Sequence, residues 1–298
     1  MGERDGLPVP ELLSVPVGDG DLTVARWGSG STVVVAPHGI TANHVSWTGV
    51  AAELGDEVTL LAPDLRGRGG SAHLGPPFGM ATHAQDCVAI LDHVGAETGI
   101  LAGHSMGGFV AVKAGSSDPD RWSSLILIDG GIGLPIPEGL EIDQVLHAVI
   151  GPAMERLEMS FGSRQEYRDY WRAHPAFRDA WSELVQRYVD YDIEQIDGGA
   201  WASKVRIDAI REDGRGSLVD ESLLTALERC PMPVRFVRAQ RGLMNGDPLY
   251  PQELVETRIA TKDDSTLRDA SEHINHYTLL LSEDGAAVVA AEIRAAIG

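Results

Sequence analysis

Short apolar runs rich in Val, Ile and Leu recur along the chain, and most are followed by a turn and then by a helical pattern. This rhythm is typical of βα units, so it predicts an α/β protein with a mostly parallel sheet covered by helices. The expected strands lie within residues 31–39 (ending near Ala36), 57–67, 98–105, 123–131 (from about Leu125 to Asp129) and 232–240, with a weaker edge strand within 265–271. The expected helices lie within residues 44–55, 80–95, 106–117 and 283–298.

Two stretches depart from this rhythm. Residues 12–30 alternate apolar and polar positions around a glycine-containing turn, which predicts an antiparallel hairpin that leads into the sheet. From Leu134 to Arg229 the pattern is helical and polar, with no convincing strand. We therefore expect a helical cap, residues 134–228, inserted into a core formed by residues 1–133 and 229–298. The cap is rich in aromatic side chains, whose helical spacing favours packing over lining a pocket: Tyr167, Tyr170, Trp171, Phe177, Trp181, Tyr188, Tyr191 and Trp201.

Charge and cysteine content exclude some classes of partner. The 298 residues include 44 acidic and 24 basic side chains, a formal net charge of -20. Because attraction to phosphate needs clustered Lys and Arg, we expect neither a nucleic acid nor an anionic membrane as partner. Cys87 and Cys230 have no metal-ligand spacing, so we expect buried free thiols. Residues 1–20 contain no apolar targeting segment, and no apolar run is long enough to span a bilayer, which predicts a cytoplasmic protein.

One short motif carries nucleophile chemistry. Gly103, Ser105 and Gly107 form the pattern G-x-S-x-G between a predicted strand and a predicted helix. In a chain with 34 glycines the bare pattern arises easily by chance, but the strand-turn-helix context is the one that a nucleophile elbow requires. Such an elbow exposes the serine Oγ beside a helix N-terminus, where developing negative charge is stabilised. We therefore predict that Ser105 is a nucleophile.

With this motif the sequence resembles the α/β-hydrolase superfamily, particularly its small cap-bearing esterases, lactonases and carbon-carbon bond hydrolases, over nearly the whole chain. The segment VVVAPHGITAN, residues 33–43, resembles the His-Gly oxyanion loop of the family. The resemblance implies that the backbone N–H groups of Ile40 and Met106 hold the oxyanion. The segment APDLRGRGGS, residues 62–71, resembles the D-x-R-G-x-G-x-S turn, which shapes the scaffold and is not expected to be catalytic.

The segment SEHINHYTLL, residues 271–280, resembles the loop that carries the general base of the family. It contains two histidines. We favour His276, because it precedes Tyr277 and an apolar run as in relatives where the sequence NHY presents the base. His273 is then a polar loop residue, and a metal site built on this pair is not expected without further ligands nearby in the sequence.

The acid of the triad departs from the family pattern. The usual turn after the strand within residues 232–240 would place its carboxylate at position 242, which is Gly242 in this chain. Two substitutes are available. Asp129 ends the preceding strand, a position from which some family members supply the acid, whereas Asp247 lies five residues beyond the usual place. We favour Asp129, because a rigid strand end holds a carboxylate better than a loop does, and keep Asp247 as the alternative.

These residues together imply a serine hydrolase that cleaves a neutral carboxylic ester or lactone through an acyl-enzyme on Ser105, with His276 as base. A serine nucleophile argues against dehalogenases and epoxide hydrolases, which use a carboxylate there. Two alternatives stay open: a hydrolase of carbon-carbon bonds in vinylogous diketones with the same triad, and a non-catalytic receptor for a small molecule. No phosphate-binding or dinucleotide motif is present, so we expect no cofactor and no metal. Whether the chain forms homo-oligomers stays open.

Overall fold

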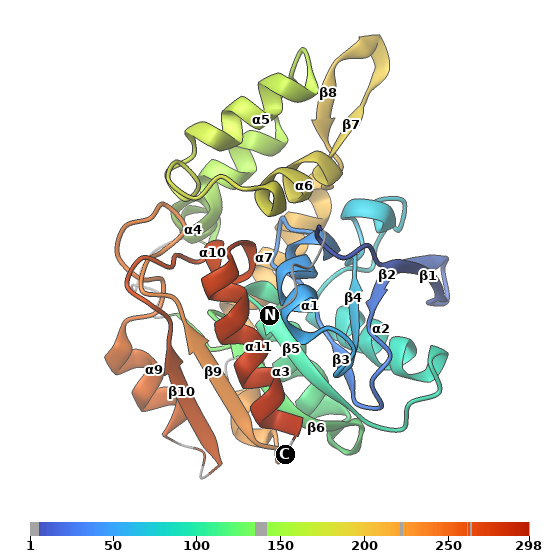
Figure 1. Ribbon diagram of the computed structural model, residues 1–298, viewed down its shortest axis with the longest axis vertical. Helices are drawn as coiled ribbons and strands as arrows, with labels where there is room; N and C mark the ends of the chain where they lie inside the picture. Colours follow the sequence, from blue (N-terminus) through green and yellow to red (C-terminus); the bar gives the residue numbers. More distant parts are fainter. Residues whose placement is uncertain are drawn as a thin grey trace.

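The computed structural model describes residues 6–134, 142–220, 223, 225–260, 262 and 264–297. Its centre is an eight-stranded sheet in the order β1-β2-β4-β3-β5-β6-β9-β10 (Figure 1). All neighbouring strands from β4 to β10 are parallel, while β2 is antiparallel to both β1 and β4. The strands are β1 (Glu11–Pro16), β2 (Asp21–Trp27), β3 (Val33–Val35), β4 (Thr59–Pro63), β5 (Gly99–His104), β6 (Trp122–Ile128), β9 (Val234–Arg238) and β10 (Ser265–Asp269). The predicted α/β class, the leading hairpin and the weak edge strand are confirmed.

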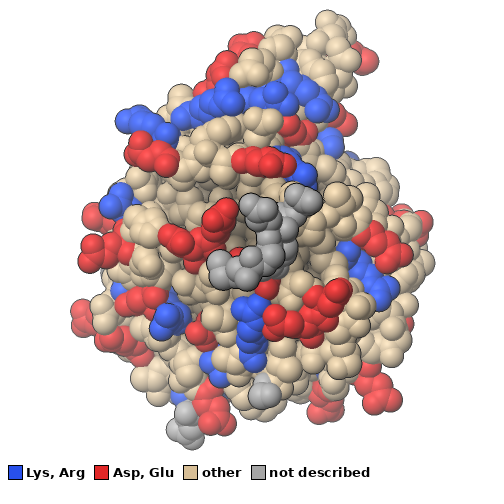
Figure 2. All heavy atoms as spheres, viewed as in Figure 1, with Lys and Arg blue, Asp and Glu red and all other residues tan. Residues whose placement is uncertain are grey.

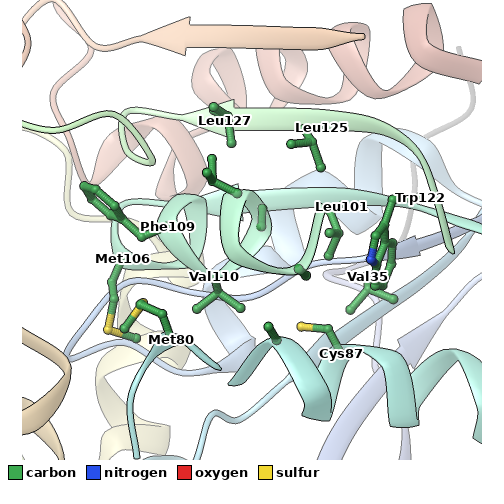
Figure 3. Close-up of a cluster of buried hydrophobic side chains, with 14 of the residues drawn as sticks. Val35, Met80, Cys87, Leu101, Met106, Phe109, Val110, Trp122, Leu125 and Leu127 are labelled. Atoms are coloured by element: carbon green, nitrogen blue, oxygen red, sulfur yellow. The ribbon is translucent and has the colours of Figure 1, made fainter. Parts of the chain in front are cut away.

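Helices cover both faces of the sheet. On one face, α2 (Met80–His93) and α3 (Met106–Ser117) pack against the central strands. Figure 3 shows apolar side chains of these helices meeting side chains from the sheet, among them Val110, Leu101 and Leu125. On the other face lie α1 (Thr48–Leu54), α10 (Thr278–Leu281) and α11 (Glu283–Ile297). The central strands are buried on both sides, which is why they appear in the sequence as continuous apolar runs.

A mainly helical segment follows β6 and precedes β9. It contains α4 (Ile142–Leu157), α5 (Arg164–Ala173), α6 (Glu183–Asp192) and α7 (Ile207–Val219), and part of it projects beyond one end of the sheet (Figure 1). The expectation that this segment contains no strand is wrong, because β7 (Ile193–Gln195) and β8 (Trp201–Ser203) form an antiparallel pair. Each has only three residues, too few for a recognisable alternation. The division into core and cap stays a prediction, and residues 135–141 at its first boundary lie outside the described residues.

Two smaller differences concern the core. Strand β6 starts at Trp122, earlier than expected, and ends at Ile128, which leaves Asp129 as the first residue beyond the strand. An additional helix, α9 (Gln252–Ile259), lies between β9 and β10 and was not predicted. Cys87 and Cys230 are free and buried, as expected.

The surface is mixed in charge. Figure 2 shows a band of Lys and Arg side chains over the part of the molecule where Figure 1 labels α5, with Asp and Glu beside it, and both charge types are scattered over the rest of this face. Within the described part of the chain, no helix is both long and apolar enough to cross a bilayer.

Candidate active site

Ser105 occupies a sharp turn between β5 and α3. Its backbone angles are φ 55° and ψ −120°, outside the region that a residue with a side chain normally adopts. Two hydrogen bonds hold this turn: Ser105 N–H donates to the Ile128 carbonyl at 2.9 Å, and Gly108 N–H donates to the Ser105 carbonyl at 2.9 Å. The strained conformation expected of a nucleophile elbow is therefore present at the predicted residue.

The glycines around Ser105 are required by close packing. A Cβ atom on Gly103 would lie 2.0 Å from the carbonyl oxygen of Gly107, so a side chain there would collide with the first turn of α3. A Cβ atom on Gly130 would lie 2.0 Å from the carbonyl oxygen of Ser105 itself. Gly103 therefore allows the end of β5 to lie close to the start of α3, and Gly130 allows the backbone after β6 to lie close to the elbow.

Asp129 and His276 come from distant parts of the sequence and meet beside the elbow. His276 Nδ1 lies 2.7 Å from Asp129 Oδ2, and both side chains are buried. The other oxygen, Oδ1, accepts a hydrogen bond from Ala239 N–H at 3.1 Å. Because the carboxylate is fixed on both oxygens, it favours the imidazole tautomer with the proton on Nδ1, which leaves Nε2 as the basic nitrogen.

The backbone of His276 is also fixed. Its N–H donates to the Arg241 carbonyl at 2.9 Å, and its carbonyl accepts a hydrogen bond from Nε2 of His104 at 2.9 Å. Burial and the neighbouring His276 hold the pKa of His104 well below its ordinary value, so His104 is a neutral donor at neutral pH. His104, the residue before Ser105 in the G-x-S-x-G motif, thus supports the position of His276.

The less favoured base, His273, and the alternative acid, Asp247, lie elsewhere. His273 is exposed, and its Nε2 lies 3.1 Å from the carboxylate of Asp284, which is also exposed. Asp247 is exposed in the loop after β9. Gly242, which stands at the usual acid position, is buried and its N–H donates to the Gly246 carbonyl at 3.2 Å.

The expected oxyanion loop follows β3. A Cβ atom on Gly39 would lie 3.2 Å from the Cβ atom of Ser105, which places the loop directly against the elbow. Arg68 Nε donates to the Ile40 carbonyl at 2.9 Å and so fixes the peptide next to the predicted oxyanion donor. In the part of the chain that the structure describes, the N–H groups of Ile40 and Met106 donate to no protein acceptor.

The segment that resembles a scaffold turn is tightly bonded. The buried carboxylate of Asp64 accepts hydrogen bonds from His44 N–H at 2.8 Å, Gly70 N–H at 2.6 Å and the Tyr191 hydroxyl at 2.6 Å. Burial alone would raise the pKa of Asp64, but the interactions with His44 and Tyr191 outweigh it and lower the pKa to about 2. Arg66 forms a bidentate ion pair with Asp86. These contacts join loops and helices to one another rather than entering the cleft.

Ser105 and His276 line a common cleft. Its walls are mostly apolar and come from the predicted oxyanion loop, from α10 and from the segment between β6 and β9, including Ile150 and Tyr188. A second cavity adjoins it, and its lining includes two residues that the sequence did not point to, Arg156 and His174. An arginine on an amphipathic helix gives no signal in the sequence that distinguishes it from a solvated one.

Comparison with known proteins agrees with this geometry. A family model described as alpha/beta hydrolase fold matches residues 32–193. Lipase LipV of Mycobacterium tuberculosis is 32% identical over 150 residues, which cover 48% of this chain and 56% of that protein. Esterase Rv0045c of the same organism is 28% identical over 70% of this chain and 66% of its own length. N-formylmaleamate deformylase of Pseudomonas putida is 31% identical over 65% of this chain and 74% of its own length. The matched part of this chain spans about half the length of LipV.

Solved structures share the fold over almost the whole chain. E-2-(acetamidomethylene)succinate hydrolase has a TM-score of 0.78 at 20% identity and covers 97% of this chain and 99% of its own. A thioesterase domain from the curacin biosynthetic pathway has a TM-score of 0.71 at 20% identity, covering 96% of this chain and 100% of its own. The match of the family model to more than half of the chain, together with the fold, shows that the chain belongs to the α/β-hydrolase superfamily.

Proposed function

We propose that this chain is a serine hydrolase that cleaves a carboxylic ester or lactone through an acyl-enzyme on Ser105. The observation that carries the proposal is the buried 2.7 Å contact between His276 Nδ1 and Asp129 Oδ2, made beside a serine held at positive φ in the same cleft. A nucleophile, a base and an acid that orients the base are the parts that acyl transfer requires.

In the proposed first half of the reaction, Nε2 of His276 takes the proton from Ser105 Oγ while Oγ attacks the carbonyl carbon of the ester. The carbonyl oxygen becomes an oxyanion, which accepts hydrogen bonds from the N–H groups of Ile40 and Met106. When the oxyanion collapses, the bond to the alkoxy oxygen breaks and His276 returns the proton to the leaving alcohol. Asp129 stabilises the imidazolium that exists between these two proton transfers.

In the second half, His276 takes a proton from a water molecule that attacks the acyl carbon. A second oxyanion forms in the same place, and its collapse releases the carboxylic acid while the proton returns to Ser105 Oγ. Each step uses groups of this chain and water.

The segment between β6 and β9 supplies cleft residues such as Ile150 and Tyr188, which supports the proposal that residues 134–228 form a cap over the site. The similar proteins include a lipase and an esterase, whose names agree with ester cleavage. They also include a deformylase, so an acyl group bound to nitrogen is a further substrate class to assay.

The proposal is tested by initial rates on p-nitrophenyl esters of increasing acyl length, with Ser105→Ala as the comparison. We expect turnover by the wild type to saturate with ester concentration, and the variant to lose at least about 10³-fold in kcat. Circular dichroism and Tm establish that the variant is folded. Equal turnover by a folded Ser105→Ala variant would refute the proposal, and absence of serine-dependent turnover on every ester would direct the assay to carbon-carbon substrates.

A further inference from the structure

The second cavity adjoins the catalytic cleft. The two share four lining residues, Ile150, Ala153, Leu243 and Tyr277. A substrate that passes these shared residues would reach the second cavity from Ser105. The side chains that line the second cavity indicate which chemical group of a substrate the cavity can bind.

Arg156 of α4 is the cation of this cavity and is 1% exposed. One of its terminal nitrogens, Nη1, lies 2.6 Å from Asp192 Oδ2 and also donates to the Tyr167 hydroxyl. Asp192 is in turn fixed through its other oxygen by the Ser203 hydroxyl at 3.0 Å. The guanidinium lies 5.0 Å from the centre of the Trp171 ring. The protein thus holds the guanidinium through Nη1 and through the face that lies over Trp171.

The opposite edge of this guanidinium is unpaired. Nε and Nη2 of Arg156 are buried and have no hydrogen-bond partner among the residues that the structure describes. Leaving buried donors unpaired is costly, and charged donors are the costliest. The N–H bonds of Nε and Nη2 are parallel, at the spacing of the two oxygens of a carboxylate, so this edge can bind a carboxylate through two hydrogen bonds.

The other walls of the cavity are compatible with an anion. No Asp or Glu is among its described lining residues, which besides Arg156 include Tyr170, Trp171 and His174. His174 Nδ1 accepts a hydrogen bond from Ala176 N–H at 3.2 Å, which leaves the proton on Nε2 as a donor. Burial and the neighbouring Arg156 lower the pKa of His174 to about 4, so the imidazole is neutral at pH 7. Arg156 is therefore the only charged residue of this described lining.

We propose that the second cavity is a carboxylate subsite, and that the substrate carries a carboxylate in addition to the acyl group that Ser105 attacks. This inference rests on the proposed function and refines its substrate class. A carboxylate fits better than a phosphate, because Arg156 is already paired with Asp192 and a phosphate would bring a second uncompensated negative charge into the cavity. The sequence predicts a neutral ester, and the net charge of the chain is the basis for preferring a neutral substrate. The local charge of Arg156 in the second cavity favours a carboxylate instead.

The kinetic test compares esters of matched length that differ in the terminal group. The pairs are the mono-p-nitrophenyl esters of succinate, glutarate and adipate against the p-nitrophenyl esters of butyrate, valerate and hexanoate. The readout is the ratio of kcat/KM for each charged ester over its neutral partner. For at least one length we expect the wild type to favour the charged ester about tenfold or more, the range of a charged hydrogen-bonded pair.

The informative variant is Arg156→Met combined with Asp192→Asn, because removing Arg156 alone would leave Asp192 buried without its partner. We expect the ratio to fall to about one in this double variant. Arg156→Lys keeps the charge but loses the parallel N–H pair, so it should retain only part of the preference for the charged ester. The matched control is Arg168→Met combined with Asp190→Asn, a partly exposed ion pair between α5 and α6 whose residues line neither cavity; it should keep the wild-type ratio.

A binding measurement separates the subsite from the reaction. In Ser105→Ala, the monomethyl esters of succinate, glutarate and adipate are compared with the corresponding dimethyl esters by the shift in Tm. Stabilisation by a half-ester alone, lost when Arg156 and Asp192 are also replaced, supports the subsite even if no ester is hydrolysed and the proposed function fails. The carboxylate subsite is overturned if half-esters are neither bound nor cleaved better than their neutral partners, or if the preference survives in the Arg156 double variant.

Discussion

The hydrogen bonds of Asp129 support the proposal that the acid of the triad lies at this strand end. Its φ is 46°, an unusual value for a residue other than glycine, and the turn aims its two oxygens at Ala239 N–H and at His276 Nδ1. The first contact joins the ends of the paired strands β6 and β9, and the second reaches the loop between β10 and α10. A carboxylate from the usual position after β9 is therefore unnecessary for orienting His276.

Asp129→Asn should lower kcat by about 10³-fold or more, because an amide favours the wrong imidazole tautomer and cannot stabilise the imidazolium. The measurement is the saturating rate on the best p-nitrophenyl ester. Asp247→Asn is the matched control and should change kcat less than about twofold, since Asp247 is exposed. Equal losses in the two variants, or a larger loss in Asp247→Asn, would reverse the assignment of the acid.

At the scale of elements, one buried cluster joins the inserted segment to the core. Asp213 of α7 lies 2.5 Å from Arg68 Nη1, accepts a hydrogen bond from Gly79 N–H at 2.6 Å, and lies 3.0 Å from His83 Nε2 on α2. Because Arg68 also donates to the Ile40 carbonyl, the contact of α7 with the core is coupled to the oxyanion loop.

Asp213→Asn should therefore reduce both stability and activity. It leaves the guanidinium of Arg68 buried without its counterion, which we expect to lower the free energy of unfolding by about 3 kcal/mol and to lower kcat through a less fixed Ile40. Urea unfolding and ester kinetics measure the two effects. The control is Asp208→Asn in the exposed ion pair with Arg206 on the same helix, expected to cost less than about 1 kcal/mol. A stable variant with full activity would show that the cluster does not support the loop.

How far the sequence predicts the elements depends on their burial. The central strands are buried on both faces and the elbow has a fixed spacing, so both were predictable. Strands β7 and β8 are three residues long and bury only Ile193, and α9 buries only Val255 and Ile259, so their patterns are weak. Arg156 was not predictable as a site residue, because its contacts with Asp192 and Trp171 form only in the folded segment. These contacts determine which nitrogens of the guanidinium stay unpaired.

At the scale of the whole molecule, buried histidines determine how stability depends on pH. His38 Nδ1 lies 2.7 Å from the Gly39 carbonyl, and its Nε2 accepts a hydrogen bond from Leu65 N–H at 3.0 Å. Protonation of Nε2 would destroy the second bond. Burial lowers the pKa of His38 to about 3, well below its ordinary value of 6.5.

The unfolded chain therefore binds a proton at His38 at a higher pH than the folded chain does. The resulting stability is fully present above pH 6.5 and is lost as the pH falls from there toward 3, at about 1.4 kcal/mol per pH unit. Urea unfolding at several pH values between 7 and 4 should show this decline. A His38→Gln variant should be less stable at pH 7 and should show a shallower decline; an unchanged slope would contradict the buried neutral state of His38.

The central claim is that Ser105, activated by His276, becomes acylated, and covalent labelling tests it most directly. The protein is incubated with an alkyl fluorophosphonate, and the modified peptide is identified by mass spectrometry in the wild type, in His276→Ala and in the control His273→Ala. We expect one adduct, on Ser105, formed at the wild-type rate in His273→Ala and at a rate lowered by about 10³-fold or more in His276→Ala. Labelling of another residue, or labelling of Ser105 at the same rate in a folded His276→Ala variant, would contradict the central claim.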